Sequence, residues 1–314
     1  MILTVLVDFI VNIKYNRYMA NVLKAYNKIQ ELRERYYKAV VGKESLIRMI
    51  NEVEVSDQVY NSNAIENSTL SLEETDKILR QIELERYISE REIFEAKNLA
   101  RVVTYVETKS KESELDFSII LSLHKMLISN IRDDIAGRFR NKDEWVRVGD
   151  HIAPNPLEVE DRLQKVLTEY NSNTAESIVK RIAKFHLGFE YVHPFCDGNG
   201  RIGRVLNNYL LTRGGYVPIN IKFIDRATYY NAFKEFQTKG VTKVMEDIVA
   251  KALTNSYHKR LAYLENKVIV NLVDYAKENK LSHANLINKA KRQTIEAFIE
   301  RGVWKIGVEK KNNK

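Results

Sequence analysis

Residues 193–204 have the sequence HPFCDGNGRIGR and concentrate side chains that could do chemistry. The chain of 314 residues has only 12 glycines and 4 prolines, yet this stretch holds three of the glycines and one of the prolines. It also carries a histidine, an aspartate, an asparagine and two arginines. Segments that combine backbone freedom with several ionisable groups are typical of binding and catalytic loops. A loop that only reversed the chain would not need all of these groups.

The residue types favour a phosphate cradle at the start of a helix. One helix is expected to end near Tyr191 and another to begin at about Arg201, with the glycine-rich loop between them. Glycines at 198 and 200 let successive backbone N–H groups converge on an anion, and a helix start adds free amides and the positive end of its dipole. Because Arg201 and Arg204 are three residues apart, they share one helix face and can both reach phosphates.

His193 and Asp197 complete a set suited to phosphoryl or nucleotidyl transfer. Asp197 offers a hard oxygen ligand for the Mg²⁺ that accompanies polyphosphates. A histidine titrates near neutrality, so His193 could accept a proton from an attacking hydroxyl group. A base, a metal ligand, an anion hole and two cations together indicate this class of reaction.

Other interpretations of the stretch remain as alternatives. Residues 198–203 have the form G-x-G-x-x-G of dinucleotide-binding loops, but that form is informative only after a β-strand, and the preceding residues have helical periodicity. A zinc site would use His186, His193 and Asp197, whose spacing matches no usual zinc pattern. Cys196 could be a nucleophile, although catalytic cysteines need partners that the sequence does not place. A glycine-rich turn with surface charges is the simplest alternative.

The stretch is similar to the signature of Fic domains, H-x-F-x-[DE]-G-N-G-R-x-x-R, at every specified position. The resemblance covers about residues 90–240. It implies a mainly α-helical Fic-type core with a small β-hairpin flap, which transfers AMP from Mg·ATP to a serine, threonine or tyrosine hydroxyl of a target protein and releases pyrophosphate. Transfer of UMP, or of phosphate by a kinase-like relative, is the alternative chemistry within the family.

The resemblance also assigns a role to each matching residue. His193 would be the catalytic base, Asp197 would hold Mg²⁺, and Phe195 would be buried. The groups expected to bind the phosphates are Gly198, Asn199, Gly200, Arg201 and Arg204. The groups expected to contact adenosine are Tyr229, Tyr230 and Gln237.

A β-hairpin is predicted within this core, upstream of the glycine-rich stretch. Trp145-Val-Arg-Val148 and His151-Ile-Ala flank a turn at Gly149-Asp150, and two prolines follow. The resemblance implies that this hairpin is a flap to which the target adds a strand through backbone pairing. The residues expected to dock the target are Val146, Val148, His151 and Ile152.

Residues 62–67, with the sequence SNAIEN, match the Fic inhibitory motif [ST]-x-x-x-E-[GN]. The motif residues are Ser62, Glu66 and Asn67. Glu66 would pair with Arg204 and so occupy the group that should receive the γ-phosphate of ATP. Without the downstream signature, a solvent-exposed helix glutamate would be the simpler interpretation.

Composition and periodicity predict a mainly helical chain. Helical segments are expected at 15–55, in a short helix ending at 65–66, and at 90–109, 116–130, 157–171, 176–190, 201–213, 225–237 and 243–280. Asn67 should close the short helix in a left-handed conformation, and Ser71 with Glu74 has capping-box spacing, so another helix should begin there. The expected domains are an N-terminal helical region (1–90), the Fic core (91–255) and a C-terminal module (256–314).

The C-terminal module is expected to be a winged helix-turn-helix. Residues 281–307 suggest two short helices, the second beginning at Lys291-Arg-Gln-Thr294, and a strand within 302–307. Residues 281–314 hold eight Lys and Arg against three Glu, a net charge of +5. Such a charge suits DNA, but a solvated tail or a dimer contact suits it as well. A DNA-binding regulator whose Fic core senses nucleotide without turnover is therefore the alternative function.

The remaining expectations concern cellular context. The single cysteine excludes an intrachain disulfide and fits a reducing compartment. The apolar N-terminus lacks a basic start and contains Asp8, so we expect neither a signal peptide nor a membrane span. We therefore expect a cytoplasmic enzyme without membrane association that uses Mg²⁺ and ATP and modifies a target protein. DNA and a second copy of the chain are further candidate partners. Residues 1–14 fit no part of this scheme, and Met19 is nearer the expected start of the fold.

Overall fold

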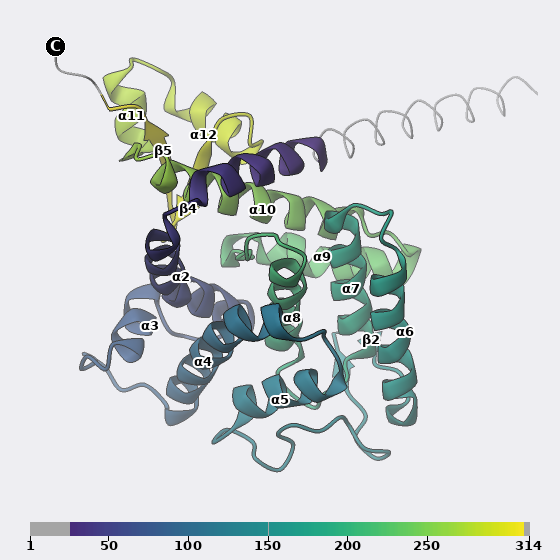
Figure 1. Cartoon of the computed structure of the whole chain (residues 1–314). Helices are drawn as coiled ribbons and strands as arrows, with labels where there is room; N and C mark the ends of the chain where they lie inside the picture. The colour runs from purple at the N-terminus through teal and green to yellow at the C-terminus, as the bar shows by residue number, and fades with distance from the viewer. Residues whose placement is uncertain (1–25, 150, 311–314) are drawn as a thin grey trace, which may run out of the picture.

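The computed structural model describes residues 26–149 and 151–310 and places one helix, α8 (Asn199–Arg213), at the centre of the others (Figure 1). Eleven of the fifteen residues of α8 are buried. The expectations for residues 1–14 and Met19, and for Asp150 in the hairpin turn, lie outside the described residues. The glycine-rich motif enters α8 directly, so the predicted phosphate cradle lies at the start of a largely buried helix.

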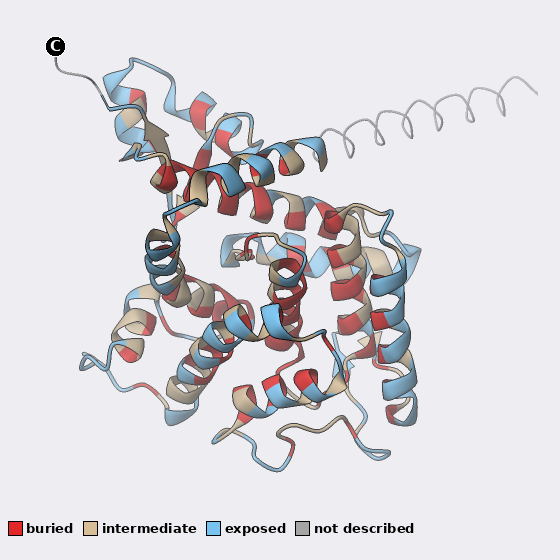
Figure 2. Ribbon diagram, viewed as in Figure 1, coloured by how far each residue is buried: buried red, intermediate tan, exposed pale blue. Residues whose placement is uncertain are grey.

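Six helices form the body around α8. They are α4 (Glu90–Glu112), α5 (Phe117–Ile128), α6 (Val159–Ser172), α7 (Ile178–Val192), α9 (Arg226–Lys239) and α10 (Lys243–Leu264). Helices α4, α5 and α7 pack on α8, and α6 covers α7. Figure 2 shows the buried faces of these helices turned toward one another. The helical segments predicted within 90–239 are thus confirmed, with ends that differ by a few residues.

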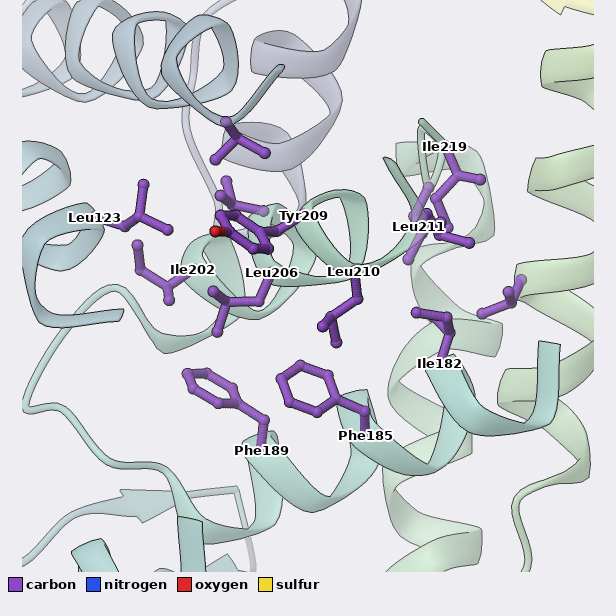
Figure 3. Close-up of a cluster of buried hydrophobic side chains, with 14 of the residues drawn as sticks. Leu123, Ile182, Phe185, Phe189, Ile202, Leu206, Tyr209, Leu210, Leu211 and Ile219 are labelled. Carbon is purple, nitrogen blue, oxygen red and sulfur yellow. The ribbon is translucent and has the colours of Figure 1, made fainter. Parts of the chain in front are cut away.

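The interface between α7 and α8 is a layer of large apolar side chains. Phe185 and Phe189 of α7 face Leu206 and Leu210 of α8 (Figure 3), and each of the four is at most 4% exposed. The two residues of each pair are four positions apart, which is the spacing of an apolar stripe on a packed helix. Burial of apolar area contributes about 25 cal/mol per Å² removed from water, so this layer stabilises the packing of the two helices that flank the motif loop.

The N-terminal segment differs from the prediction of helix over 15–55. A helix over residues 26–40 ends before Gly42, whose φ of +73° turns the chain, and α2 (Glu44–Ile65) follows as a single helix of 22 residues. The short helix predicted up to 65–66 is therefore the end of α2. Asn67 closes it at a φ of +70°, as predicted.

The helix predicted to begin at Ser71 is confirmed as α3 (Leu72–Leu79). The Ser71 hydroxyl accepts a hydrogen bond from the Glu74 N–H, and the Glu74 carboxylate accepts one from the Ser71 N–H, so the capping box is complete. The predicted hairpin is confirmed as β1 (Arg147–Val148) and β2 (His151–Ile152), which pair antiparallel and lead into the 3₁₀ turn η1 (Pro156–Glu158). A second 3₁₀ turn, η2 (Phe223–Asp225), precedes α9.

The C-terminal part contains more strand than predicted. After α10 come β3 (Val268–Asn271), α11 (Leu272–Glu278), α12 (His283–Lys291), β4 (Ala297–Glu300) and β5 (Val303–Val308). The strands form one antiparallel sheet in the order β3-β5-β4. The final predicted strand is confirmed as β5.

Two predictions in this part are wrong. The helix predicted over 243–280 stops at Leu264, because Asn266 takes a φ of +55° and the β-branched residues that follow pair with β5. The second helix predicted from Lys291 is absent: Gln293, at a φ of +54°, ends α12, and Ala297–Glu300 is the buried strand β4. The two short helices are α11 and α12 instead.

The described residues form two hydrophobic cores. The main one runs from Ile29 to Leu261 and includes buried residues of the N-terminal region as well as of the helices around α8. A smaller one lies within the C-terminal part and consists of Leu272, Ala276, Leu286, Ala290 and Ala297. Within the described residues, no helix has the length and apolar character needed to cross a membrane.

Candidate active site

The motif loop joins two helices. His193 ends α7 in the left-handed conformation, with a φ of +49°, and Gly198 begins α8 at a φ of +81°. Because Gly198 is the N-cap, α8 starts at Asn199, two residues before the predicted start. The element that leads directly into the loop is helix α7 and not a strand, so the dinucleotide-binding interpretation lacks the context that it requires. The N–H groups of the first turn of α8 have no partner within the helix, which is what the predicted anion hole requires.

The loop is held from inside by Asn199. Its side-chain oxygen accepts a hydrogen bond from the Phe195 N–H (2.9 Å), and its side-chain nitrogen donates to the Phe195 carbonyl (2.8 Å). Phe195 is fully buried, as expected, and stacks on the His124 ring with 3.7 Å between centroids. The Gly137 N–H donates to His124 Nδ1, so Nε2 is the donor to the Asp197 carbonyl at 3.1 Å. The Asn199 side chain therefore shapes the loop, and its backbone N–H remains at the helix start.

Arg140 fastens the loop to the chain that follows the hairpin. Its buried guanidinium donates to the carbonyls of His193 (2.8 Å) and Val192 (3.3 Å), and to that of Pro154 (3.0 Å) just beyond β2. Nothing in the local sequence distinguishes this arginine from the others in the chain. The role of Arg140 is visible only in the fold, which brings these carbonyls together.

His193 is placed as a neutral proton acceptor. Its Nδ1 lies 3.4 Å from the Glu190 carbonyl oxygen, which can only accept, so Nδ1 carries the hydrogen and Nε2 is the nitrogen that can take a proton. Burial lowers the pKa of His193 to about 4. The Glu190 carboxyl lies 3.7 Å from Nδ1, and burial raises the pKa of Glu190 to about 8. Both shifts favour the neutral forms of these groups, so the contact differs from an ion pair between charged side chains.

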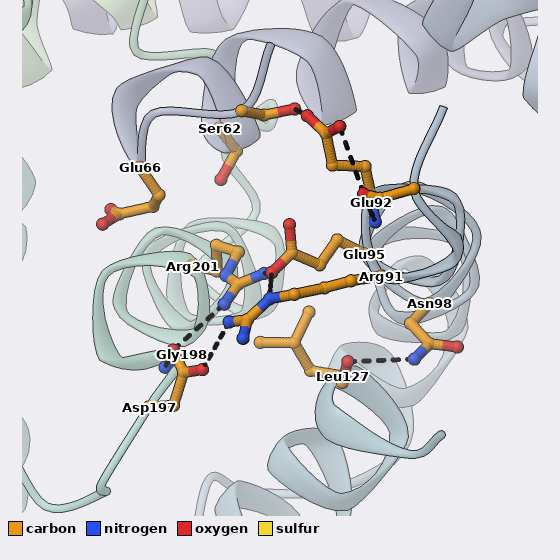
Figure 4. Close-up of polar contacts among 12 residues, drawn as sticks. Ser62, Glu66, Arg91, Glu92, Glu95, Asn98, Leu127, Asp197, Gly198 and Arg201 are labelled. Atoms are coloured by element: carbon orange, nitrogen blue, oxygen red, sulfur yellow. Dashed lines mark hydrogen bonds and ion pairs between the residues drawn. The ribbon is translucent and has the colours of Figure 1, made fainter. Parts of the chain in front are cut away.

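Asp197 belongs to a ring of four charged side chains that joins the loop to α4 (Figure 4). Its Oδ1 accepts from Gly198 N–H (2.6 Å) and Arg201 Nη2 (3.2 Å), and its Oδ2 lies 3.0 Å from Arg91 Nη2. Glu95 closes the ring at 3.1 Å from both Arg91 Nε and Arg201 Nη1. Arg91 and Glu95 are about a hundred residues from the motif, and sequence analysis did not identify them.

The residues of the predicted brake lie together over the start of α8. Figure 4 shows Ser62 and Glu66 at the end of α2, beside α8. Glu66 Oε1 accepts from Arg204 Nη2 at 2.9 Å, and the same guanidinium donates to the Ser62 hydroxyl (2.9 Å) and carbonyl (2.8 Å). A Cβ atom on Gly200 would lie only 2.2 Å from Glu66 Oε1. The carboxylate therefore lies against the backbone of the first turn of α8.

Tyr229 orients the other side of Arg204. Arg204 Nη1 donates to the Tyr229 hydroxyl (3.2 Å), which in turn donates to His186 Nε2 (2.7 Å). Burial lowers the pKa of His186 to about 3, so it is neutral and can accept this bond. Tyr230 is 38% exposed and donates to the Ile65 carbonyl (3.2 Å), and Gln237 is exposed on α9.

The zinc and cysteine alternatives find no support in this arrangement. His186 is engaged with Tyr229, and among residues 26–149 and 151–310 no group of three His, Cys, Asp or Glu side chains could hold a metal ion. Burial, together with Glu144 beside it, raises the pKa of Cys196 to about 11. A thiol that stays protonated at neutral pH is a poor nucleophile.

Comparison with known proteins identifies the motif-bearing region. Residues 114–211 match the model of the Fic/DOC family. The chain contains a Fic domain. It is 30% identical over 211 residues to the protein adenylyltransferase Fic of Nematostella vectensis, covering 65% of this chain and 48% of that protein. It is 28% identical over 305 residues to the protein of the same name from Drosophila melanogaster, covering 90% and 61%. The chain thus spans about half to three-fifths of the length of these relatives.

Solved structures show the same fold. A Fic domain containing signaling protein from Bacteroides thetaiotaomicron superposes with a TM-score of 0.67 at 22% identity, over 76% of this chain and 97% of that chain. A Fic family protein from Desulfovibrio desulfuricans superposes with a TM-score of 0.64 at 20% identity, over 93% of this chain and 97% of that one. The mainly helical, Fic-type architecture expected from the sequence is therefore confirmed.

The hairpin lies against the C-terminal end of α7 in the Fic domain. His151 Nε2 lies 3.0 Å from the Tyr191 carbonyl, and the two rings are 4.7 Å apart. The Val146 carbonyl accepts from Ala153 N–H, so its backbone is used within the hairpin. Val148 and Ile152 are 39% and 64% exposed. The hairpin therefore exposes two apolar side chains and contacts Tyr191, which is two residues from His193.

Proposed function

We propose that this protein is an autoinhibited protein adenylyltransferase that moves AMP from Mg·ATP to a hydroxyl group of a target protein. The observation that carries the proposal is the Glu66 carboxylate, which lies against Gly200 and pairs with Arg204. An anion thus already fills the cradle at the start of α8, where helix amides and an arginine favour phosphate. The names of the similar proteins from Nematostella and Drosophila support the same activity.

His193 supplies the base for the transfer. Its Nε2 would take the proton of a serine, threonine or tyrosine hydroxyl as that oxygen forms a bond to the α-phosphorus of ATP. The bond from the α-phosphorus to the oxygen that bridges to the β-phosphorus breaks, and pyrophosphate leaves. A positioned general base contributes about 10²- to 10⁴-fold to such a step. The neutral state of the buried imidazole at pH 7 suits this role.

The phosphates would occupy the first turn of α8. The backbone N–H groups of Gly198, Asn199 and Gly200 would bind phosphate oxygens, with Arg201 and Arg204 on the outer phosphates. Mg²⁺ is commonly bound by one or two carboxylates together with substrate phosphates, so the lone carboxylate of Asp197 on this loop fits it. Bound there, the ion would offset phosphate charge.

The adenosine would contact α9, and the target would contact the hairpin. Tyr230 and Gln237, both accessible at α9, are the proposed adenosine contacts, whereas the buried Tyr229 is better suited to holding Arg204. A segment of the target would add to the hairpin as a strand, with Val148 and Ile152 against its side chains. Backbone pairing would place the hydroxyl while tolerating different target sequences.

Glu66 would act as the brake. While its carboxylate holds Arg204, the γ-phosphate meets a negative charge and lacks its cation, so ATP cannot bind productively. Release requires the end of α2 to move, and Ser62 holds Arg204 from the same helix by two further hydrogen bonds. Inhibition would thus depend on the docking of the end of α2 and on more than one of its side chains.

The test uses ATP labelled at either the α- or the γ-phosphate. Purified wild type, Glu66→Gly and Glu66→Gly/His193→Ala proteins are each incubated with Mg²⁺ and a cell extract that supplies acceptor proteins. We expect protein labelling from the α-position only, stronger with Glu66→Gly and abolished in the double variant. Labelling from the γ-position would instead establish a phosphotransferase, and no labelling by Glu66→Gly with ATP binding intact would favour a nucleotide sensor.

For the C-terminal part we propose a winged-helix module that contacts DNA through α12. The order β3, α11, α12, β4, β5 and the sheet order β3-β5-β4 suit such a module. Lys289, Lys291 and Arg292 are exposed on and just after α12, which would lie in the major groove. Fluorescence anisotropy with duplex DNA should show binding that weakens steeply with salt and with charge removal at these three residues. Unchanged binding in the triple variant would refute this assignment.

A further inference from the structure

We propose that Arg91, which lies outside the Fic signature, is a third phosphate-binding arginine that rests on Asp197 until Mg·ATP displaces it. The inference rests on the adenylyltransferase function proposed above. Arg91 is the second residue of α4, and its side chain is 57% exposed, whereas that of Arg201 is only 4% exposed. The two arginines meet the same aspartate but differ in their freedom to move.

The two oxygens of Asp197 have different partners. Oδ1 is held by Gly198 N–H and by the buried Arg201, which belong to the motif itself. Oδ2 points to Arg91 Nη2, 3.0 Å away (Figure 4). A divalent cation that binds this carboxylate without disturbing the loop must take Oδ2. Arg91 and the metal ion therefore compete for one oxygen.

Glu95 keeps Arg91 at the site when it leaves Asp197. Arg91 Nε lies 3.1 Å from Glu95 Oε1, and Glu95 is fixed in turn by Arg201 Nη1 at 3.1 Å. Exposed ion pairs are weak, so a divalent cation can readily displace the contact with Asp197. The guanidinium, still tethered through Nε, then has its Nη donors free beside the loop that receives the phosphates. Arginine presents such donors in a fork that matches phosphate oxygens.

The test measures ATP binding in a protein with the brake released and the base removed, Glu66→Gly/His193→Ala. Titration calorimetry gives the Kd for ATP at saturating Mg²⁺ and the Mg²⁺ concentration that gives half-maximal binding. Both are compared after a further Arg91→Gln, Arg91→Lys or Arg101→Gln change. Arg101 is the matched control, because it lies on α4, is exposed, and bonds to Asn98 and the Met126 carbonyl instead of the loop.

We expect Arg91→Gln to weaken ATP binding at saturating Mg²⁺ roughly three- to thirtyfold, as the loss of one exposed charge-assisted contact would. The same change should lower the Mg²⁺ concentration needed for half-maximal binding, because a competing cation is gone. Arg91→Lys should retain part of the affinity, and Arg101→Gln should leave both quantities within about twofold.

Two results would overturn the inference. If Arg91→Gln matches Arg101→Gln, Arg91 does not bind phosphate, and ATP binding by the starting protein leaves the proposed function intact. If Arg91→Gln raises both the Kd and the Mg²⁺ requirement, Arg91 only orders the loop. A starting protein that binds no ATP would refute the proposed function itself, and the inference with it.

Discussion

Removing the carboxylate of Glu66 should release the active site. Glu66→Gly takes away both the charge and the bulk that lie against Gly200, and Glu66→Gln takes away the charge alone. Glu66 is the residue that caps the end of α2, a place where glycine costs a helix little. Both variants should therefore fold, and their comparison separates electrostatic from steric inhibition.

The size of the effect follows from the contact. Arg204 is 7% exposed and Glu66 34% exposed at the side-chain level, and their atoms are 2.9 Å apart. A hydrogen bond to a charged group contributes about 1.5–3 kcal/mol, and each 1.4 kcal/mol is about tenfold in an equilibrium constant. Productive ATP binding should thus rise roughly 10- to 150-fold in Glu66→Gly. Glu66→Gln should give a smaller increase, because the amide still lies over the cradle.

The assay is initial-rate labelling from α-labelled ATP, with the Kd for Mg·ATP measured in parallel because it needs no acceptor protein. Glu52→Gln is the matched control, since Glu52 is an exposed glutamate on the same helix. It should behave as wild type in both measurements. Equal ATP affinity and equal labelling in wild type, Glu66→Gly and Glu66→Gln would refute the inhibitory role of the pair.

Three further predictions concern the buried groups of the site. Gly200→Ala places a Cβ atom 2.2 Å from Glu66 Oε1, so it should lower the melting temperature of the wild type but much less that of Glu66→Gly; equal losses would argue against this close approach. The pKa of Glu190 is raised to about 8, so its contribution to stability is complete below its ordinary pKa and is lost as pH rises from about 4.5 through 8. Glu190→Gln should therefore be more stable than the wild type at pH 9, by up to a few kcal/mol in urea unfolding, but not at pH 5; the same difference at both would contradict the burial of this carboxyl. The pKa values of His124 and His193 are lowered to about 4, so stability should fall as pH drops from about 6.5 to 4, and His193→Ala should flatten that fall; an unchanged slope would mean that His193 is solvated.

The part of the site that lies in one continuous stretch of sequence could be predicted. The residues from His193 to Arg204 lie in one loop and one helix turn, so their types and spacing already described a phosphate cradle. Ser62 and Glu66 were found because a second motif could be matched to the first. Their contact with Arg204 joins residues about 140 positions apart, and only the docking of α2 on α8 produces it.

The parts that were missed depend on tertiary structure. Arg91 and Arg140 carry no local signal, because an arginine on a helix or in a loop is ordinary until its partners are known. Strand β4 (Ala297–Glu300) was taken for helix because its residues have no strand-like alternation: all four are buried or half-buried between β5 and α10. In short segments, sheet pairing overrides local propensity.

The most direct test of the account is a pair of Mg·ATP-bound crystal structures, of the wild type and of Glu66→Gly. The account predicts that the Glu66–Arg204 pair persists in the wild type with the phosphates misplaced. In Glu66→Gly, Arg204 should bind the γ-phosphate and the α-phosphate should lie within reach of a hydroxyl bonded to His193 Nε2. A wild-type complex with the γ-phosphate on Arg204 while Glu66 stays in place would contradict the account.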